Sequence, residues 1–128
     1  MESGDFTPAD VKHVNAHATS TPVGDIPESL AISELLGDKV SDALVSATKS
    51  MTGHLLGGTG AVEAILTVKA LQTRTAPPTI NVDEVDPKVK GINIVRDTPQ
   101  DLPSGDIAAI TNSFGFGGHN AVVAFRSV

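Results

Sequence analysis

A glycine-rich junction between an apolar strand pattern and an apolar helix pattern constrains this chain more than any other segment. Residues 43–48 read as a short buried strand, and residues 61–71 read as a helix that is apolar on most sides. The junction carries Lys49 and His54, and Glu63 lies at the start of the helix pattern. Charged side chains at such a junction face a pocket more often than bulk water. We therefore expect a strand, a turn lined with polar groups and a buried helix here.

The rest of the chain shows the same alternation of short strands and helices. Residues 25–36 form a helix pattern, with Asp25 as the expected N-cap and Gly37 as the residue that ends the helix. The last two strand patterns are joined by a glycine-rich turn, which favours an antiparallel pair. The further expected strands are residues 11–16, 92–95, 107–112 and 121–125.

This order predicts an α/β fold in which helices pack on a mixed sheet. Aromatic residues make up only 3% of the chain, so the core has to be built from aliphatic side chains. At 128 residues, without a repeat or a linker, we expect one domain spanning residues 1–128.

Composition excludes several classes of function. The net charge of −6 gives no electrostatic footprint for nucleic acid or an anionic membrane. No apolar run is long enough to span a bilayer, and residues 1–5 lack the basic start of a signal peptide, so we expect a cytoplasmic protein. The chain has no cysteine, hence no disulfide and no thiol nucleophile of its own.

Lys49, His54 and Glu63 form the strongest candidate site. A lysine and a glutamate brought together near a histidine can fix its orientation and its protonation state. The alternative is a solvated lysine, a loop histidine and a glutamate on a helix surface. The apolar neighbours of Glu63 weigh against that alternative, because a carboxylate in such a helix needs a partner.

Two further segments carry residues of interest. His17 follows the first strand, and in α/β sheets ligands bind at the carboxyl ends of the strands. The hydroxyls of Thr19, Ser20 and Thr21 are either turn residues or contacts for a polar ligand chain. The glycines of residues 115–118 suit either a plain hairpin or a loop whose N–H groups form an oxyanion hole.

The histidines do not have the spacing of a zinc site, and no cysteine is available, so we expect no metal centre. His13 and His119 are expected to be surface or supporting residues.

Three motifs together resemble the β-ketoacyl-acyl-carrier-protein synthases, most closely the bacterial chain-elongating type of fatty-acid synthesis. They are NAHATSTPVGD at residues 15–25, KSMTGH at 49–54 and NSFGFGGHN at 112–120. The resemblance covers almost the whole chain from Val11 onward and corresponds to the C-terminal part of the family only.

The resemblance implies a thiolase-like half, in which a mixed sheet lies between helices, and a decarboxylative Claisen condensation. In such a reaction malonyl-carrier protein loses carbon dioxide and the resulting carbanion attacks an acyl thioester held on a cysteine. Implied partners are the acyl carrier protein, the missing N-terminal half of the enzyme and a second copy in a homodimer. No cofactor is implied, since the carrier protein brings the phosphopantetheine arm.

The resemblance also assigns roles to single residues. His17 and His54 match the two active-site histidines that hydrogen-bond the malonyl thioester carbonyl, and Lys49 and Glu63 match a supporting pair. The remaining matches are Thr19 and Thr21 to the threonines that bind the phosphopantetheine arm, and Phe116, with Phe114 beside it, to the gating phenylalanine whose N–H contributes to the oxyanion hole.

Two departures matter. Ala18 stands where the motif more often has glycine, and the nucleophilic cysteine of the family belongs to the N-terminal half. The chain alone is therefore expected to be inactive. Alternatives are a polyketide ketosynthase fragment, a chain-length-factor subunit and a non-catalytic module that binds carrier protein. The two retained histidines argue against the chain-length factor.

Overall fold

A computed structural model describes residues 5–127, and its centre is a five-stranded mixed sheet in the order β4-β2-β1-β6-β7. The strands β1, β2, β4 and β6 pair in parallel, and β7 runs antiparallel to β6. This confirms the predicted mixed sheet and its antiparallel final pair. The strands are β1 (Val11–Asn15), β2 (Leu44–Ser46), β4 (Asn93–Ile94), β6 (Ala108–Gly115) and β7 (His119–Arg126).

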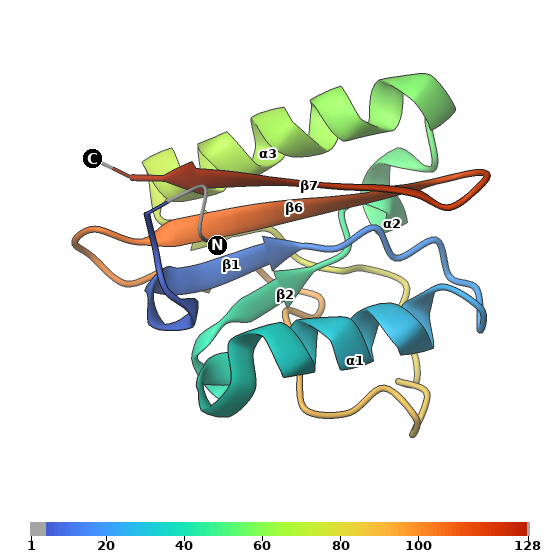
Figure 1. The fold of residues 1–128 in the computed structure, drawn as a ribbon, viewed down its shortest axis with the longest axis horizontal. Helices are drawn as coiled ribbons and strands as arrows, with labels where there is room; N and C mark the ends of the chain where they lie inside the picture. Colours follow the sequence, from blue (N-terminus) through green and yellow to red (C-terminus); the bar gives the residue numbers. More distant parts are fainter. Residues whose placement is uncertain (1–4, 128) are drawn as a thin grey trace.

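Two long helices cover opposite faces of this sheet, α1 (Asp25–Leu36) and α3 (Thr59–Thr73) (Figure 1). Successive side chains of β6 point to opposite faces of the sheet, and both faces are apolar. Ile110 packs with α1, whereas Ala109 packs with α3. The shorter elements are α2 (Lys49–Thr52), the 3-10 helices η1 (Pro8–Asp10), η2 (Gly37–Asp42) and η3 (Leu56–Gly58), and a separate antiparallel pair of β3 (Thr75–Ala76) and β5 (Gln100–Asp101).

The start of α1 differs from the prediction. Gly24, not Asp25, is the N-cap, because the backbone N–H groups of both residues already bond to the carbonyl of Thr21 in the preceding turn. Asp25 becomes the first helical residue, where its charge favours the positive end of the helix. Gly37 ends the helix as predicted, with φ at 56°.

The sequence predicts that α3 is buried on most sides, but the structure leaves one stripe of this helix exposed. Its buried residues include Thr59, Glu63 and Thr67, whereas Ile65 is 62% exposed. The face toward the sheet is therefore rich in polar groups, and part of the apolar face lies open. Within residues 5–127 no helix combines the length and the apolar composition that crossing a membrane requires.

The parallel strands place the candidate residues at one edge. Because β1, β2 and β6 run in the same direction, their carboxyl ends meet there. His17 follows β1, Lys49 begins α2 just after β2, and Phe114 lies near the end of β6.

Candidate active site

His17 and His54 meet at this edge of the sheet. Their ring centroids are 5.6 Å apart with an interplanar angle of 89°, an edge-to-face contact. The ring of Phe114 lies 5.3 Å from that of His17, with an interplanar angle of 56°. The structure thus brings together two histidines from separate motifs and one phenylalanine from the third.

Hydrogen bonds define the tautomer of His54. The backbone N–H of Leu56 lies 3.3 Å from Nδ1 and can only donate, so Nδ1 carries the lone pair and Nε2 carries the proton. Leu56 holds this position with φ at 50°, a left-handed conformation that is costly for a leucine. The hydroxyl of Thr59 also lies 3.0 Å from Nδ1.

His17 is held less tightly. Among the described residues its Nδ1 is buried without a hydrogen-bond partner. Burial, together with the positive charge of Lys49 and the charge that His54 carries when it is protonated at low pH, lowers the pKa of His17 to about 4. Near neutral pH His17 is therefore uncharged, and a neutral imidazole has one N–H to donate.

Lys49 and Glu63 form a buried ion pair. Lys49 Nζ is 2.6 Å from Glu63 Oε1, and their side chains are 4% and 0% exposed. Burial raises the pKa of Glu63, against the lowering effect of the hydrogen bonds from Lys49 and Thr48. Asn15 supports the same helix turn by donating from Nδ2 to the Glu63 carbonyl at 3.3 Å. The sequence expectation that Glu63 needs a partner is confirmed.

Glu28 joins two of the motifs, a role that sequence reasoning missed. Its carboxylate accepts the backbone N–H groups of His17 and Ala18, each at 2.8 Å, and the Asn112 side-chain amide, also at 2.8 Å. Glu28 is 4% exposed although it lies on an amphipathic helix pattern. The one sequence feature that could have indicated this role is the position of Glu28, three residues after Asp25 in the first turn of a helix that follows the histidine motif.

The loop after His17 brings the two threonines together. The hydroxyl oxygens of Thr19 and Thr21 are 3.4 Å apart, and Thr21 also accepts the N–H of Gly24 at 3.2 Å. Ala18 has φ at 30°, where a side chain is unfavourable, so glycine would suit this position better. The departure at Ala18 therefore strains the backbone but leaves both hydroxyls in place.

Phe114 lies in β6, and Phe116 lies two residues later in the turn between β6 and β7. Phe114 contacts His17, whereas Phe116 lies at the tip of the turn with 90% of its surface exposed. Gly117 and Gly118 follow with φ of 78° and 80°, which only glycine adopts at little cost.

The remaining histidines lie away from this cluster. His13 is fully buried rather than at the surface, and its Nε2 is 3.0 Å from Ser46 Oγ. His119 is exposed at the start of β7. Within residues 5–127 no group of three or more histidine, aspartate or glutamate side chains could hold a metal ion.

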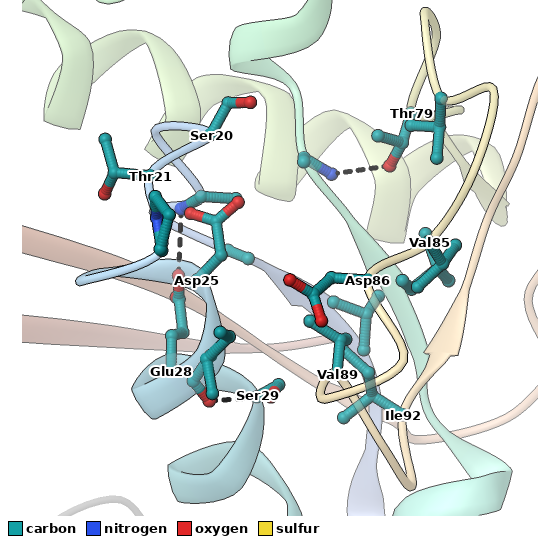
Figure 2. Close-up of a pocket in the computed structure, with 18 of the residues that line it drawn as sticks. Ser20, Thr21, Asp25, Glu28, Ser29, Thr79, Val85, Asp86, Val89 and Ile92 are labelled. Atoms are coloured by element: carbon teal, nitrogen blue, oxygen red, sulfur yellow. Dashed lines mark hydrogen bonds between the residues drawn. The ribbon is translucent and has the colours of Figure 1, made fainter.

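A cavity of about 480 Å³ lies behind the threonine loop, between α1 and residues 82–92 (Figure 2). Its floor includes Val45 and Ala47 of the sheet region, and Asp25 and Asp86 line it from opposite sides. Neither of the two clustered histidines lines this cavity, so it is separate from the histidine cluster.

The fold matches that of the C-terminal half of known ketosynthases. The family model of the β-ketoacyl synthase C-terminal domain matches residues 1–83, and the chain belongs to this family. Its relatives include the 3-oxoacyl-[acyl-carrier-protein] synthase 2 of Staphylococcus aureus strain COL, 46% identical over 127 residues, and that of Synechocystis sp., 44% identical over 126 residues. Each alignment covers 98% of this chain and 30% of the relative.

Solved ketosynthases share the fold closely. A β-ketoacyl synthase from Burkholderia phymatum STM815 is 34% identical, with a TM-score of 0.89 over 99% of this chain and 30% of that one. A ketosynthase of a type II polyketide system, solved with its acyl-carrier protein (AntDE:AntF), is 30% identical, with a TM-score of 0.91 over the same shares. The mixed sheet is thus the thiolase-like C-terminal half of a ketosynthase, and the chain spans about 30% of the length of the relatives it matches.

Proposed function

We propose that this chain supplies the decarboxylation half of the active site of a 3-oxoacyl-[acyl-carrier-protein] synthase in fatty-acid elongation. The contact between His17 and His54, at 5.6 Å between ring centroids, is the observation that carries the proposal. Two N–H donors from these rings can hydrogen-bond one oxygen on which negative charge develops.

In this proposal the malonyl thioester carbonyl oxygen lies against the two histidines. The bond between the malonyl α-carbon and its carboxylate breaks, carbon dioxide leaves, and the electron pair passes into an enolate whose oxygen the two N–H groups stabilise. The α-carbon then attacks the acyl thioester on the cysteine, forms the new carbon–carbon bond and releases the thiolate. The cysteine belongs to the N-terminal half of the enzyme, because this chain has none.

The other site residues support these steps. Lys49 and Glu63 form a structural and electrostatic support pair beside the histidines, and their contact at 2.6 Å is consistent with that role. Thr19 and Thr21 present hydroxyls to the phosphopantetheine arm that the acyl carrier protein brings. Phe116 gates the acyl site and offers its backbone N–H to the oxyanion, with Phe114 packed on His17 beside it.

Reconstitution of both halves tests this function. The purified chain alone should form no ketoacyl product, and adding the N-terminal half of a condensing enzyme should restore condensation with malonyl-carrier protein. In the reconstituted enzyme, His54→Ala should reduce malonyl decarboxylation by about 100-fold or more, the usual loss for one oxyanion donor. Product from the chain alone, or unchanged decarboxylation by the variant, would refute the proposal.

A polyketide ketosynthase fragment is the second candidate, favoured by the solved polyketide ketosynthase that shares the fold with a TM-score of 0.91. The higher identity of 46% to a 3-oxoacyl-[acyl-carrier-protein] synthase 2 supports a function in fatty-acid elongation over one in polyketide synthesis. Competition between saturated acyl and polyketo acyl carrier proteins in the reconstituted enzyme distinguishes the two.

A non-catalytic carrier-protein module is the remaining alternative. Capture of acyl carrier protein by the chain, without any activity after the N-terminal half is supplied, would favour that module. Restored condensation would favour the enzyme.

A further inference from the structure

We propose that Thr59 is a positioning residue that holds the imidazole of His54 in the Nε2–H tautomer. Thr59 lies in none of the motifs that identify the site, and its side chain is 4% exposed at the first residue of α3. Its hydroxyl is 3.0 Å from His54 Nδ1. The inference concerns the site of the proposed function, but its structural part does not depend on that function.

The direction of this hydrogen bond follows from the neighbouring backbone. The N–H of Leu56 points at the same Nδ1, so that atom carries no proton and the Thr59 hydroxyl has to donate. The threonine contact, at 3.0 Å, is shorter than the backbone contact, at 3.3 Å. Thr59 is thus the closer of two donors that converge on one lone pair.

The position of Thr59 on the helix supports a dedicated role. A hydroxyl at a helix start commonly caps the free N–H groups of the first turn. Here the N-cap is Gly58 and makes no side-chain cap. The described hydrogen bond of the Thr59 hydroxyl goes to His54 instead. Because α3 also carries Glu63, one rigid helix aligns both the ion pair and the histidine.

The consequence for His54 is a fixed donor. With Nδ1 occupied by two donors, the proton stays on Nε2, at the ring edge that is free to face a ligand oxygen. His17 has no such restraint, since its Nδ1 has no partner among residues 5–127. The two histidines therefore differ: hydrogen bonds to Nδ1 fix the tautomer of His54, whereas no such hydrogen bond fixes the tautomer of His17.

Nitrogen NMR of the chain tests this assignment directly. With histidine labelled with ¹⁵N and His54 assigned from His54→Gln, the wild type should show a protonated Nε2 and an Nδ1 resonance displaced by hydrogen bonding. Thr59→Val, which removes only the hydroxyl, should move the Nδ1 resonance downfield. Thr59→Ser should keep the wild-type position, and Thr59→Ala provides a second hydroxyl-free variant if the valine variant does not fold.

Thr67→Val is the matched control. Thr67 is also buried in α3, and its hydroxyl donates to the Glu63 carbonyl at 2.7 Å rather than to a histidine. It should leave the His54 resonances in place. Unchanged His54 resonances in both hydroxyl-free Thr59 variants, or an equal displacement in Thr67→Val, would overturn the assignment.

Kinetics of the reconstituted enzyme separate this inference from the proposed function. Thr59→Val should lower kcat for malonyl decarboxylation about tenfold with KM nearly unchanged, and Thr59→Ser should restore it, because a misplaced donor weakens the transition state more than binding. If the wild-type reconstituted enzyme does not decarboxylate at all, the proposed function fails, while the NMR result still decides the role of Thr59.

Discussion

At the scale of single residues, the ion pair of Lys49 and Glu63 places two charges on buried side chains. Replacing one member leaves the other charge buried and uncompensated, which costs more than the pair contributes. We expect Lys49→Met to lower the free energy of unfolding by about 3 kcal/mol at pH 7. Lys39→Met removes a lysine from an exposed pair with Asp38 and should cost less than about 0.5 kcal/mol.

The decrease in the free energy of unfolding caused by Lys49→Met should depend on pH. Burial already raises the pKa of Glu63, and removing Lys49 removes an influence that lowers it. The folded variant then binds a proton at Glu63 more readily than the unfolded chain does, so stability increases as the pH falls from 8 to 5. Urea unfolding at several pH values measures this, and a loss in Lys49→Met no greater than in Lys39→Met would contradict it.

His13 gives a second effect of pH at the residue scale. Burial lowers its pKa to about 4, and its Nε2 contacts Ser46 Oγ, whose hydroxyl donates to the Pro77 carbonyl. Between pH 6.5 and 4 the unfolded chain binds more protons at this residue than the folded chain. The free energy of unfolding should therefore decrease as the pH falls through this range, by up to about 1 kcal/mol per pH unit.

The variant His13→Gln isolates this contribution, because glutamine retains a donor for Ser46 but cannot be protonated. Its stability should fall less steeply below pH 6.5 than that of the wild type, whereas His17 contributes equally to both proteins. Urea unfolding at pH 8 provides the reference at which His13 is neutral in both states. Parallel pH profiles of the two proteins would rule out this account.

At the scale of elements, the sequence predicts what local periodicity determines. The five strands of the sheet and both long helices were predicted, because alternation along the strands and helical spacing are properties of neighbouring residues. The contacts of Glu28 could not be predicted in this way, since its bond to Asn112 joins residues 84 positions apart. The Gly24 cap was missed because it depends on the turn at Thr21.

The environment of α3 shows the same limit. Its apolar pattern predicted burial on most sides, yet Ile65 is 62% exposed. A periodic pattern indicates which residues avoid water, but it does not indicate which part of a protein covers them. The relatives are more than three times as long as this chain, so they contain further segments that could cover such a face. Among site residues, Glu63 was predictable because its neighbours are apolar, whereas Thr59 lacks any such signal.

Glu28 provides a test at the scale of elements, because it links α1 to the ends of β1 and β6. Glu28→Gln replaces one of the two acceptor oxygens with an NH2 group, which cannot accept a hydrogen bond. The variant therefore loses either the bonds from His17 and Asn112 to one oxygen or the bond from Ala18 to the other. We expect a loss of about 2 kcal/mol in stability, the usual contribution of a hydrogen bond to a charged group. The backbone amides of His17 and Ala18 should also exchange with solvent faster.

Glu34→Gln, an exposed change on the same helix, should have almost no effect on stability or on these amides. Equal amide exchange in Glu28→Gln and the wild type would show that the loop does not depend on this carboxylate.

At the scale of the whole molecule, apolar side chains lie open on and around α3. Besides Ile65 of α3, Leu55 and Leu56 just before it are exposed, and so is Val123 of β7, on the same sheet face as Phe125, which packs with α3. Exposed apolar groups that gather on one part of a protein commonly mark an interface.

The expectation that residues 1–128 form one domain stays a prediction, and a single transition seen by both circular dichroism and fluorescence of an attached probe would support it.

An N-terminal half that carries the cysteine is the partner that the proposed function requires, and we expect it to bind over α3. Ile65→Glu places a charge on the exposed part of this helix, so it should weaken association with that half by at least tenfold while changing the stability of the chain itself by less than about 1 kcal/mol. Leu30→Glu is the matched control, because Leu30 is 56% exposed on α1, on the opposite face of the sheet (Figure 1). Titration calorimetry of both variants with the N-terminal half measures the affinities. Equal weakening by both substitutions would contradict an interface on α3, because the loss of affinity would then not depend on which helix carries the new charge.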